Sequence, residues 1–174
     1  LGLAGNISLT EGMEPINEDF QQILPDIFQP SAMIDRFHLF IPGWKLPKIS
    51  EGQLYYGWAI DSEVFSEYLH YMRTSSYSQS FFDEFVEYDK STAYVRHANA
   101  VRKIATAWCK LLFPHIKSVA ELEEADLAKF KRLYSEYCLR PAVAARAYIY
   151  EQCKLIDSEY KHNTMPAFTV SGIE

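Results

Sequence analysis

Two polar residues stand at the expected ends of secondary structure elements, where an anionic group could be bound. Asn6 follows an apolar, strand-like stretch, and an amide at the carboxyl end of a strand can hold a water or a phosphate oxygen. An Asn at that place is also a common turn residue. Arg96 lies in the first turn of the strongest predicted helix, where a cation opposes the helix dipole and requires an anionic partner. That partner is either a neighbouring Asp or Glu or a nucleotide phosphate.

A third candidate, Arg36, is enclosed by apolar residues in the segment MIDRFH and follows an acidic residue. A fork-shaped guanidinium in this setting either pairs with a nearby carboxylate or is presented across a protein interface. Composition alone favours the local ion pair. Arg102, Lys103 and Lys110 follow on the same predicted helix as Arg96, and their pattern favours a solvated helix face over a binding patch.

No self-contained catalytic centre can be recognised in the chain. The sequence contains no GxxxxGK[ST] phosphate loop, no HExxH, no GxSxG and no paired metal-binding cysteines. The five histidines are dispersed and never fall four residues apart on a predicted helix, so no metal site is expected. The aromatic cluster FIPGW…LYYGW indicates a core or an interface rather than a platform for stacking bases.

Composition restricts the class of protein. A chain of 174 residues with 48% hydrophobic content can bury one substantial core with room for a small second lobe. A net charge of −6 with interspersed signs argues against a generic nucleic-acid-binding surface, which needs clustered Lys and Arg. The three cysteines are expected to be reduced, buried thiols, which favours a cytoplasmic location. No apolar run is long enough for a membrane span, so no membrane partner is expected.

The first sixty residues mix short strands with helical turns. An apolar strand is predicted over residues 1–7, and without neighbouring strands it would favour aggregation or pairing between copies. A proline-punctuated acidic stretch follows, with a short helix over residues 17–23. Ser31 is a candidate N-cap for a helical turn, and a strand over residues 38–41 ends at the following Pro-Gly pair.

From about residue 61 the apolar spacing becomes helical. Asp61 is a candidate cap for a helix whose apolar stripe consists of Val64, Phe65, Tyr68, Leu69 and Met72. The same pattern continues over residues 79–88, and the strongest helix spans residues 92–113 until Pro114 ends it.

Two further helices are predicted near the carboxyl end. Ser118 is a candidate cap for one that runs to about residue 137, and Pro141 then either restarts the helix or kinks the path into the other, which runs to about residue 156. Residues 165–174 then form a linker or an isolated strand.

Four segments in order carry a family pattern: LAGNIS, LPDIF, AMIDRFHLFIPGWKLPKIS and YVRHANAVRKIATAWCKLLFPH. Together they closely resemble the AAA+ module of the Lon-protease-like family of BREX phage-defence systems, over roughly residues 1–160. The resemblance implies a fold that is mainly α with a small α/β part. Residues 1–60 would be the carboxyl-terminal part of the AAA+ α/β core, residues 61–160 its helical lid, and residues 161–174 a linker towards a Lon-like domain.

The resemblance also implies roles for the polar residues. Asn6 looks like the sensor-1 residue, which positions the attacking water or contacts the γ-phosphate. Arg36 looks like an arginine finger, which reaches into the nucleotide site of a neighbouring subunit and stabilises charge on the transferred phosphoryl group. Arg96 looks like the sensor-2 arginine, with Arg102 as the alternative. The acidic residue expected beside the sensor-2 arginine is His97 here.

On this interpretation the chain is a fragment of a ring-forming P-loop ATPase whose motor is related to MCM-type helicases. The Walker motifs would precede Leu1 and a Ser-Lys peptidase dyad would lie in a later domain, so this chain alone should be inactive. ATP and Mg²⁺ would bind the longer protein and not this fragment by itself. That protein would form a homo-oligomeric ring in phage defence and contact DNA through regions outside this chain.

A second interpretation belongs to a different class of protein. The chain would then be a self-standing helical interaction module without nucleotide chemistry. Arg36 and Arg96 would form structural ion pairs, and the FIPGW region would be a protein-binding face.

Overall fold

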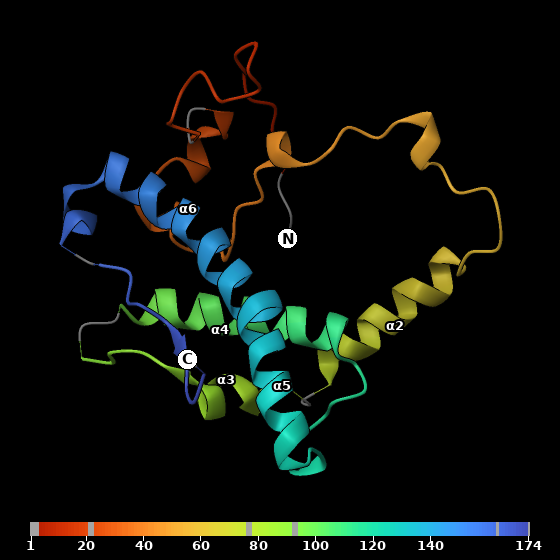
Figure 1. Cartoon of the computed structure of the whole chain (residues 1–174). Helices are drawn as coiled ribbons and strands as arrows, with labels where there is room; N and C mark the ends of the chain where they lie inside the picture. Colours follow the sequence, from red (N-terminus) through yellow and green to blue (C-terminus); the bar gives the residue numbers. More distant parts are fainter. Residues whose placement is uncertain (1–3, 21–22, 76–77, 92–93, 163, 174) are drawn as a thin grey trace.

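A computed structural model describes residues 4–20, 23–75, 78–91, 94–162 and 164–173, and they fold mainly into helices (Figure 1). The helices are α1 (Ser31–Ile34), α2 (Ser62–Thr74), α3 (Ser80–Phe85), α4 (Val95–Leu112), α5 (Glu124–Tyr134) and α6 (Arg140–Ile156). Short 3-10 turns are η2 (Asp26–Phe28), η3 (Gly43–Lys45), η4 (Glu51–Gln53), η5 (Val119–Glu121) and η7 (Ser158–Lys161), and η6 (Ser135–Leu139) is a π-helix. A mainly helical fold with a small sheet was predicted and is confirmed.

Helix α4 is the centre of the packed body. Its inner face buries Val101, Ile104, Ala105 and Cys109, which recur at spacings of three and four residues and therefore share one side of the helix. This face packs against side chains of α3, α5 and η6, among them Phe81, Phe85, Phe130, Tyr134 and Cys138. The helix predicted over residues 92–113 is confirmed for Val95–Leu112, and its apolar residues Trp108 and Leu112 are exposed.

Helices α5 and α6 form one bent, continuous helical path (Figure 1), which corresponds to the kink and not to the restart considered at Pro141. The π-helix η6 lies between them, directly before Arg140 and Pro141. Proline lacks the N–H that a regular helical turn requires, and a wider π turn is one way in which a helix accommodates such a defect. Ser118 does not cap this path, since α5 begins at Glu124.

Helix α2 is capped as predicted but does not bury its apolar stripe. The Asp61 carboxylate accepts hydrogen bonds from the backbone N–H groups of Glu63 and Val64, which satisfies two free donors at the helix start. The helix extends away from the body (Figure 1), and only its Met72 is buried. The other stripe residues are exposed: Val64 by 63%, Phe65 by 48%, Tyr68 by 43% and Leu69 by 36%.

The amino-terminal region differs most from the prediction. Residues 1–3 lie outside the described part, and residues 4–7 are not in a strand. The helix predicted over residues 17–23 is absent from residues 17–20, where the Phe20 N–H donates to the Gln152 side chain of α6. The strand predicted over residues 38–41 is also absent, and the Phe40 N–H donates to the Ala145 carbonyl of α6. Tertiary contacts to one helix thus replace both local patterns.

The carboxyl-terminal tail pairs with the body. Strand β2 (Thr169–Val170) runs antiparallel to β1 (Val86–Glu87), with Val170 opposite Val86. Met165, Phe168 and Ile173 pack against the main core. All three cysteines are free and buried, as predicted. Within the described ranges, no helix has the length and apolar character needed to cross a bilayer.

Two matched Phe-to-Ala substitutions test whether the apolar stripe of α2 belongs to the core. Phe85→Ala should lower the free energy of unfolding by about 3–5 kcal/mol, because Phe85 is 2% exposed and its loss leaves a cavity. Phe65→Ala should change it by less than about 0.5 kcal/mol, because Phe65 lies on an exposed face. Denaturant titration measures both, and an equal cost would contradict the placement of α2.

Candidate functional site

Arg36 and Arg96, which are 60 positions apart in the sequence, line the same small pocket. Its volume is about 220 Å³, and it lies between the end of α1, the start of α4 and the middle of α6. Lys103, seven residues after Arg96 on α4, and Arg146 of α6 bring the cations of the described lining to four. Asp35 is the only acidic residue among the lining residues that the structure describes. The pocket is therefore suited to an anion.

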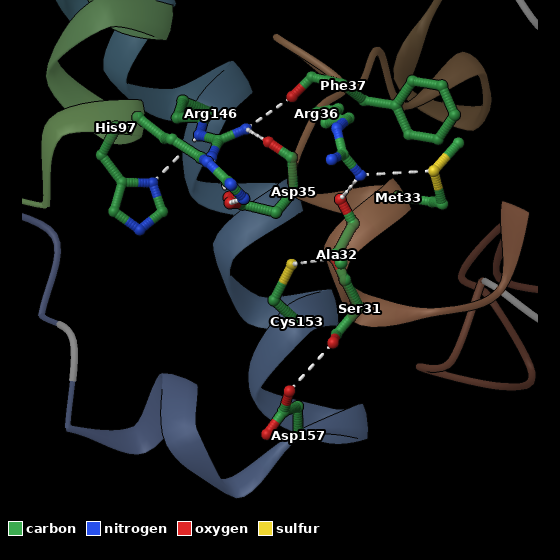
Figure 2. A network of polar contacts seen from close by, with 11 residues as sticks. Ser31, Ala32, Met33, Asp35, Arg36, Phe37, His97, Arg146, Cys153 and Asp157 are labelled. Carbon is green, nitrogen blue, oxygen red and sulfur yellow. Dashed lines mark hydrogen bonds and ion pairs between the residues drawn. The ribbon is translucent and has the colours of Figure 1, made fainter.

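Arg36 is exposed and makes no ion pair with the adjacent Asp35. Its Nη1 donates to the carbonyl oxygen of Ala32 at 2.8 Å and approaches the Met33 sulfur at 3.4 Å. Both neighbours belong to α1, so the guanidinium is held by uncharged groups (Figure 2). The prediction that Arg36 pairs with a nearby carboxylate is wrong. The Asp35 side chain turns into the protein, towards Arg96 and Arg146.

Asp35 is instead the centre of a buried network. It is 2% exposed, and its Oδ1 accepts from Nη2 of Arg146 on α6 at 2.5 Å. Arg146 is fully buried and also donates to the carbonyl oxygens of Asp35 and Phe37 and to the ring of His97 (Figure 2). Three of these hydrogen bonds tie the segment after α1 to α6, and the fourth joins α6 to α4. They fix the backbone on both sides of Arg36.

Arg96 completes this network from the solvent side. Its Nη1 donates to Oδ2 of Asp35 at 2.6 Å, while 46% of its side chain stays exposed. The structural ion pair considered for Arg96 is thus present, with a partner distant in sequence. Its side chain also lies over the Tyr94 ring, 5.9 Å from the centroid. The Asp35 carboxylate fixes the Arg96 guanidinium at the mouth of the pocket. The exposed N–H groups of this guanidinium can still donate to a ligand.

Asp35 stays ionised because of its partners. Burial alone would raise its pKa, but hydrogen bonds and charge attraction from Arg96 and Arg146 outweigh burial and hold the pKa below its ordinary value. A histidine paired with a carboxylate has a raised pKa, whereas the pKa of His97 is lowered. Burial, and then the charge of Arg146, lower its pKa to about 4. His97 is therefore neutral at pH 7, with Nδ1 accepting from Nε of Arg146 at 3.0 Å.

His38 and Lys103 form the other side of the pocket. Lys103 Nζ lies 3.2 Å from Nε2 of His38. Burial lowers the pKa of His38, and the charges of Lys103 and Arg146 lower it further. A neutral His38 accepts from the lysine ammonium and leaves the positive charge on Lys103. The cations of the pocket are thus not neutralised by this histidine.

The other two predicted site residues lie outside the pocket. Asn6 is exposed in a segment without regular structure. Arg102 pairs with Asp83 of α3 and lines a different groove, between α2 and α4. Arg102, the alternative to Arg96, lies six residues after it on α4. Six residues are about one and two-thirds helical turns, which places the two side chains on different faces.

Sequence reasoning missed two residues of this site. Lys103 had been assigned to a solvated face, but it lies seven residues after Arg96 and therefore on the same side of α4. Arg146 stands in the apolar run AVAARAYIY, and an arginine in such a run signals a buried ion pair. Its partner Asp35 also replaces the acidic residue that was expected next to Arg96, where His97 stands.

The aromatic cluster divides into two parts. Trp44 packs against Phe20, Phe40 and Tyr148, with ring centroids 5.2, 5.8 and 6.5 Å away. The LYYGW part is exposed, and Trp58 is 99% accessible. The first part therefore anchors the pocket segment to α6, while the second part is surface. Within the described ranges, no group of three His, Cys, Asp or Glu could hold a metal ion.

A comparison of two aspartates tests the buried network. Asp35→Asn should lower the free energy of unfolding by roughly 3 kcal/mol or more, because it leaves the buried Arg146 without a counter-charge. Asp83→Asn removes a carboxylate from an ion pair whose side chains are 44% and 55% exposed, and it should cost less than about 1 kcal/mol. Chemical denaturation at pH 7 measures both, and equal costs would show that Asp35 is not the structural centre.

The buried His97 predicts a dependence of stability on pH. Its folded pKa of about 4 lies below the ordinary 6.5, so the unfolded chain takes up a proton first as the pH falls below about 6.5. Stability should therefore decrease between pH 7 and pH 5, by roughly 1–2 kcal/mol from this residue. His97→Gln should reduce this difference. NMR titration of the ring protons provides the pKa directly, and a value near 6.5 would contradict the burial of the imidazole.

Comparison of the sequence with known proteins identifies relatives of this chain. The curated "Lon-like protease BrxL" of Bacillus cereus (strain H3081.97) is 29% identical over 126 residues, which is 72% of this chain and 17% of that protein. The protein of the same name from Escherichia coli O9:H4 (strain HS) is 32% identical over 90 residues, 49% of this chain and 13% of that protein. The chain thus spans less than a fifth of the length of either relative. The family described as "Lon-like protease BrxL-like, ATPase domain" matches residues 1–166, and the chain belongs to this family.

Proposed function

We propose that this chain supplies phosphate-binding arginines to a ring-forming AAA+ ATPase of a BREX-type phage-defence system. In this proposal the chain is part of a longer protein whose other segments hold ATP and Mg²⁺ and contact DNA. Membership of an ATPase-domain family supports the nucleotide chemistry. The observation that carries the proposal is the exposed Arg36 beside Arg96 in one cationic pocket.

The two arginines would have different tasks. Arg36 is exposed and bonded to uncharged groups, so it can move towards a phosphate without breaking an ion pair. A guanidinium placed in this way stabilises the charge that develops on a transferred phosphoryl group. Arg96 is fixed by Asp35 and would report nucleotide binding to the helical part, because Asp35 also bonds to Arg146 of α6. Asn6 remains a candidate for positioning the attacking water.

The shared pocket favours a contact across a subunit interface. Arg36 and Arg96 face the same side of the chain, in one pocket whose described lining contains a single acidic residue, Asp35. A phosphate bound by a neighbouring subunit could therefore meet both arginines. Such action in trans agrees with the arginine-finger role of Arg36.

ATP hydrolysis by the longer protein tests the role of Arg36. Arg36→Ala should lower turnover at least about a hundredfold while ATP binding persists, because the loss affects the transition state more than the ground state. Arg132→Ala removes an exposed arginine on α5 and serves as the matched control. Both proteins are compared with unmodified protein at the same oligomeric state. Unchanged turnover in Arg36→Ala would refute the arginine-finger role.

Mixed assemblies test whether Arg36 acts in trans. A second variant lacks the P-loop lysine of the longer protein and is inactive by itself. If Arg36 reaches a neighbouring site, mixing this variant with Arg36→Ala protein restores hydrolysis, because some interfaces then combine an intact P-loop with an intact arginine. A mixture that stays inactive would indicate that both groups act within one subunit.

A helical interaction module without nucleotide chemistry is the second candidate function. The exposed apolar residues before and on α2 favour it, including Trp58 at 99% and Tyr56 at 86% exposure. This candidate requires no phosphate loop in the protein that contains the chain. It predicts that turnover does not depend on Arg36.

A further inference from the structure

The net charge of the chain is concentrated at its amino-terminal end. Of the 23 acidic residues, six fall within residues 1–35 and 17 follow, whereas all 17 basic residues follow residue 35. The stretch up to residue 35 therefore carries the whole net charge of −6, and the rest of the chain is neutral. Most of this acidic stretch is at the surface.

Residues 8–18, which we call the acidic loop, present this charge together with apolar side chains. Glu11, Glu14 and Glu18 are exposed, and between them Met13 and Ile16 are 39% and 59% exposed. A surface that combines carboxylates with unburied apolar groups is complementary to one that combines cations with apolar groups.

The acidic loop is preformed. The Ile16 N–H donates to the Ser8 carbonyl at 3.0 Å, and the Thr10 N–H donates to the Glu14 carbonyl at 2.8 Å. At its base, the Gln152 side chain of α6 donates to the Glu18 carbonyl at 2.7 Å. A loop that is already closed loses little conformational entropy on binding.

The complementary surface is the groove between α2 and α4. Its volume is about 790 Å³, which is within the range of ordinary binding clefts. The described residues that line it include four cations and no acidic residue. Arg102 is paired with Asp83, and Lys110 donates to the Met72 and Ser75 carbonyls. Arg73 and Lys103 are exposed at the edge.

Apolar side chains continue from this groove along α2. Leu69, Met72 and Leu111 line the groove itself, and Phe65 and Tyr68 extend the apolar surface outwards. The groove therefore combines an apolar floor with a cationic rim. The acidic loop combines apolar side chains with carboxylates, so the two surfaces are complementary in charge.

The loop and the groove of one molecule lie on different sides of it. In Figure 1 the acidic loop is in the red segment above α6, and α2 extends away from the body on another side. We propose that the acidic loop of one copy docks into the α2–α4 groove of the next copy. This contact is heterologous, so repetition produces either a closed ring or an open chain of subunits.

A single loop–groove contact would be weak, but the contacts between successive subunits of an assembly would add together. One loop in one groove buries less surface than a standard interface, and its charges at the rim contribute mainly to steering and register. Met13 and Ile16 would supply the apolar contact. The contact needs neither nucleotide nor Arg36. If the loop–groove contact is disproved, the phosphate-binding proposal is unaffected. If the phosphate-binding proposal is disproved, the loop–groove contact is unaffected.

Charge reversal with rescue tests this interface in the chain itself, by sedimentation equilibrium at low salt without nucleotide. The loop variant carries Glu11→Lys and Glu14→Lys, and the groove variant carries Arg73→Glu and Ala107→Glu. Each should weaken self-association at least about tenfold. The chain with all four substitutions should associate within about threefold of the unmodified chain, because the reversed charges are again complementary.

A matched control separates local pairing from net charge. Glu136→Lys and Glu159→Lys change the net charge as the loop variant does, but at exposed positions of η6 and η7, and should not weaken association. The proposal is overturned if the unmodified chain is monomeric up to about millimolar concentration. It is also overturned if the loop variant associates normally or if the fourfold variant remains as weak as the separate variants.

Discussion

The ion pair between Arg146 and Asp35 is the interaction on which the arrangement of the pocket depends. Both side chains are buried, and removal of two charges from water is costly unless each finds its partner and further hydrogen bonds. Arg146 satisfies this condition with donors to His97 and to two carbonyl oxygens of the segment after α1. The segment after α1 is therefore held against α4 and α6 by polar contacts, although it is not part of a β-sheet.

This arrangement explains why two neighbouring residues behave so differently. Asp35 points inwards and is shared by Arg96 and Arg146, so Arg36 has no carboxylate partner in α1 and stays at the surface. A guanidinium paired with a carboxylate and one bonded only to uncharged groups then border a single pocket. Lys103 adds charge to the same place without changing the hydrogen bonds of Asp35. With this arrangement one cation can bind an anion from a fixed position while the other can approach the same anion.

The molecule buries some of its apolar residues and leaves others at the surface. The inner face of α4 packs densely with α3 and α5, whereas α2 and the segment before it expose large apolar side chains. Helix α2 nevertheless has a regular apolar stripe and a good cap. A stripe of this kind needs a partner surface. The cationic groove beside it, and the acidic loop on another side of the molecule, provide charges that could select a further copy as that partner.

Local spacing and capping were sufficient to predict that helices dominate from residue 61 onwards, the Asp61 cap and the burial of the three cysteines, although α3 ends at Phe85 before strand β1 and α5 begins only at Glu124. The sequence also singled out Arg36 and Arg96. It could not determine that both line one pocket, or that Asp35 lies between Arg96 and Arg146, since these partners are 61 and 111 positions apart. The strands expected at residues 1–7 and 38–41 are absent over the described positions because a strand requires a neighbour; in the second segment the Phe40 N–H donates to the Ala145 carbonyl of α6 instead. Only the tertiary structure decides which surface an amphipathic helix meets, which is why the stripe of α2 was predictable and its exposure was not.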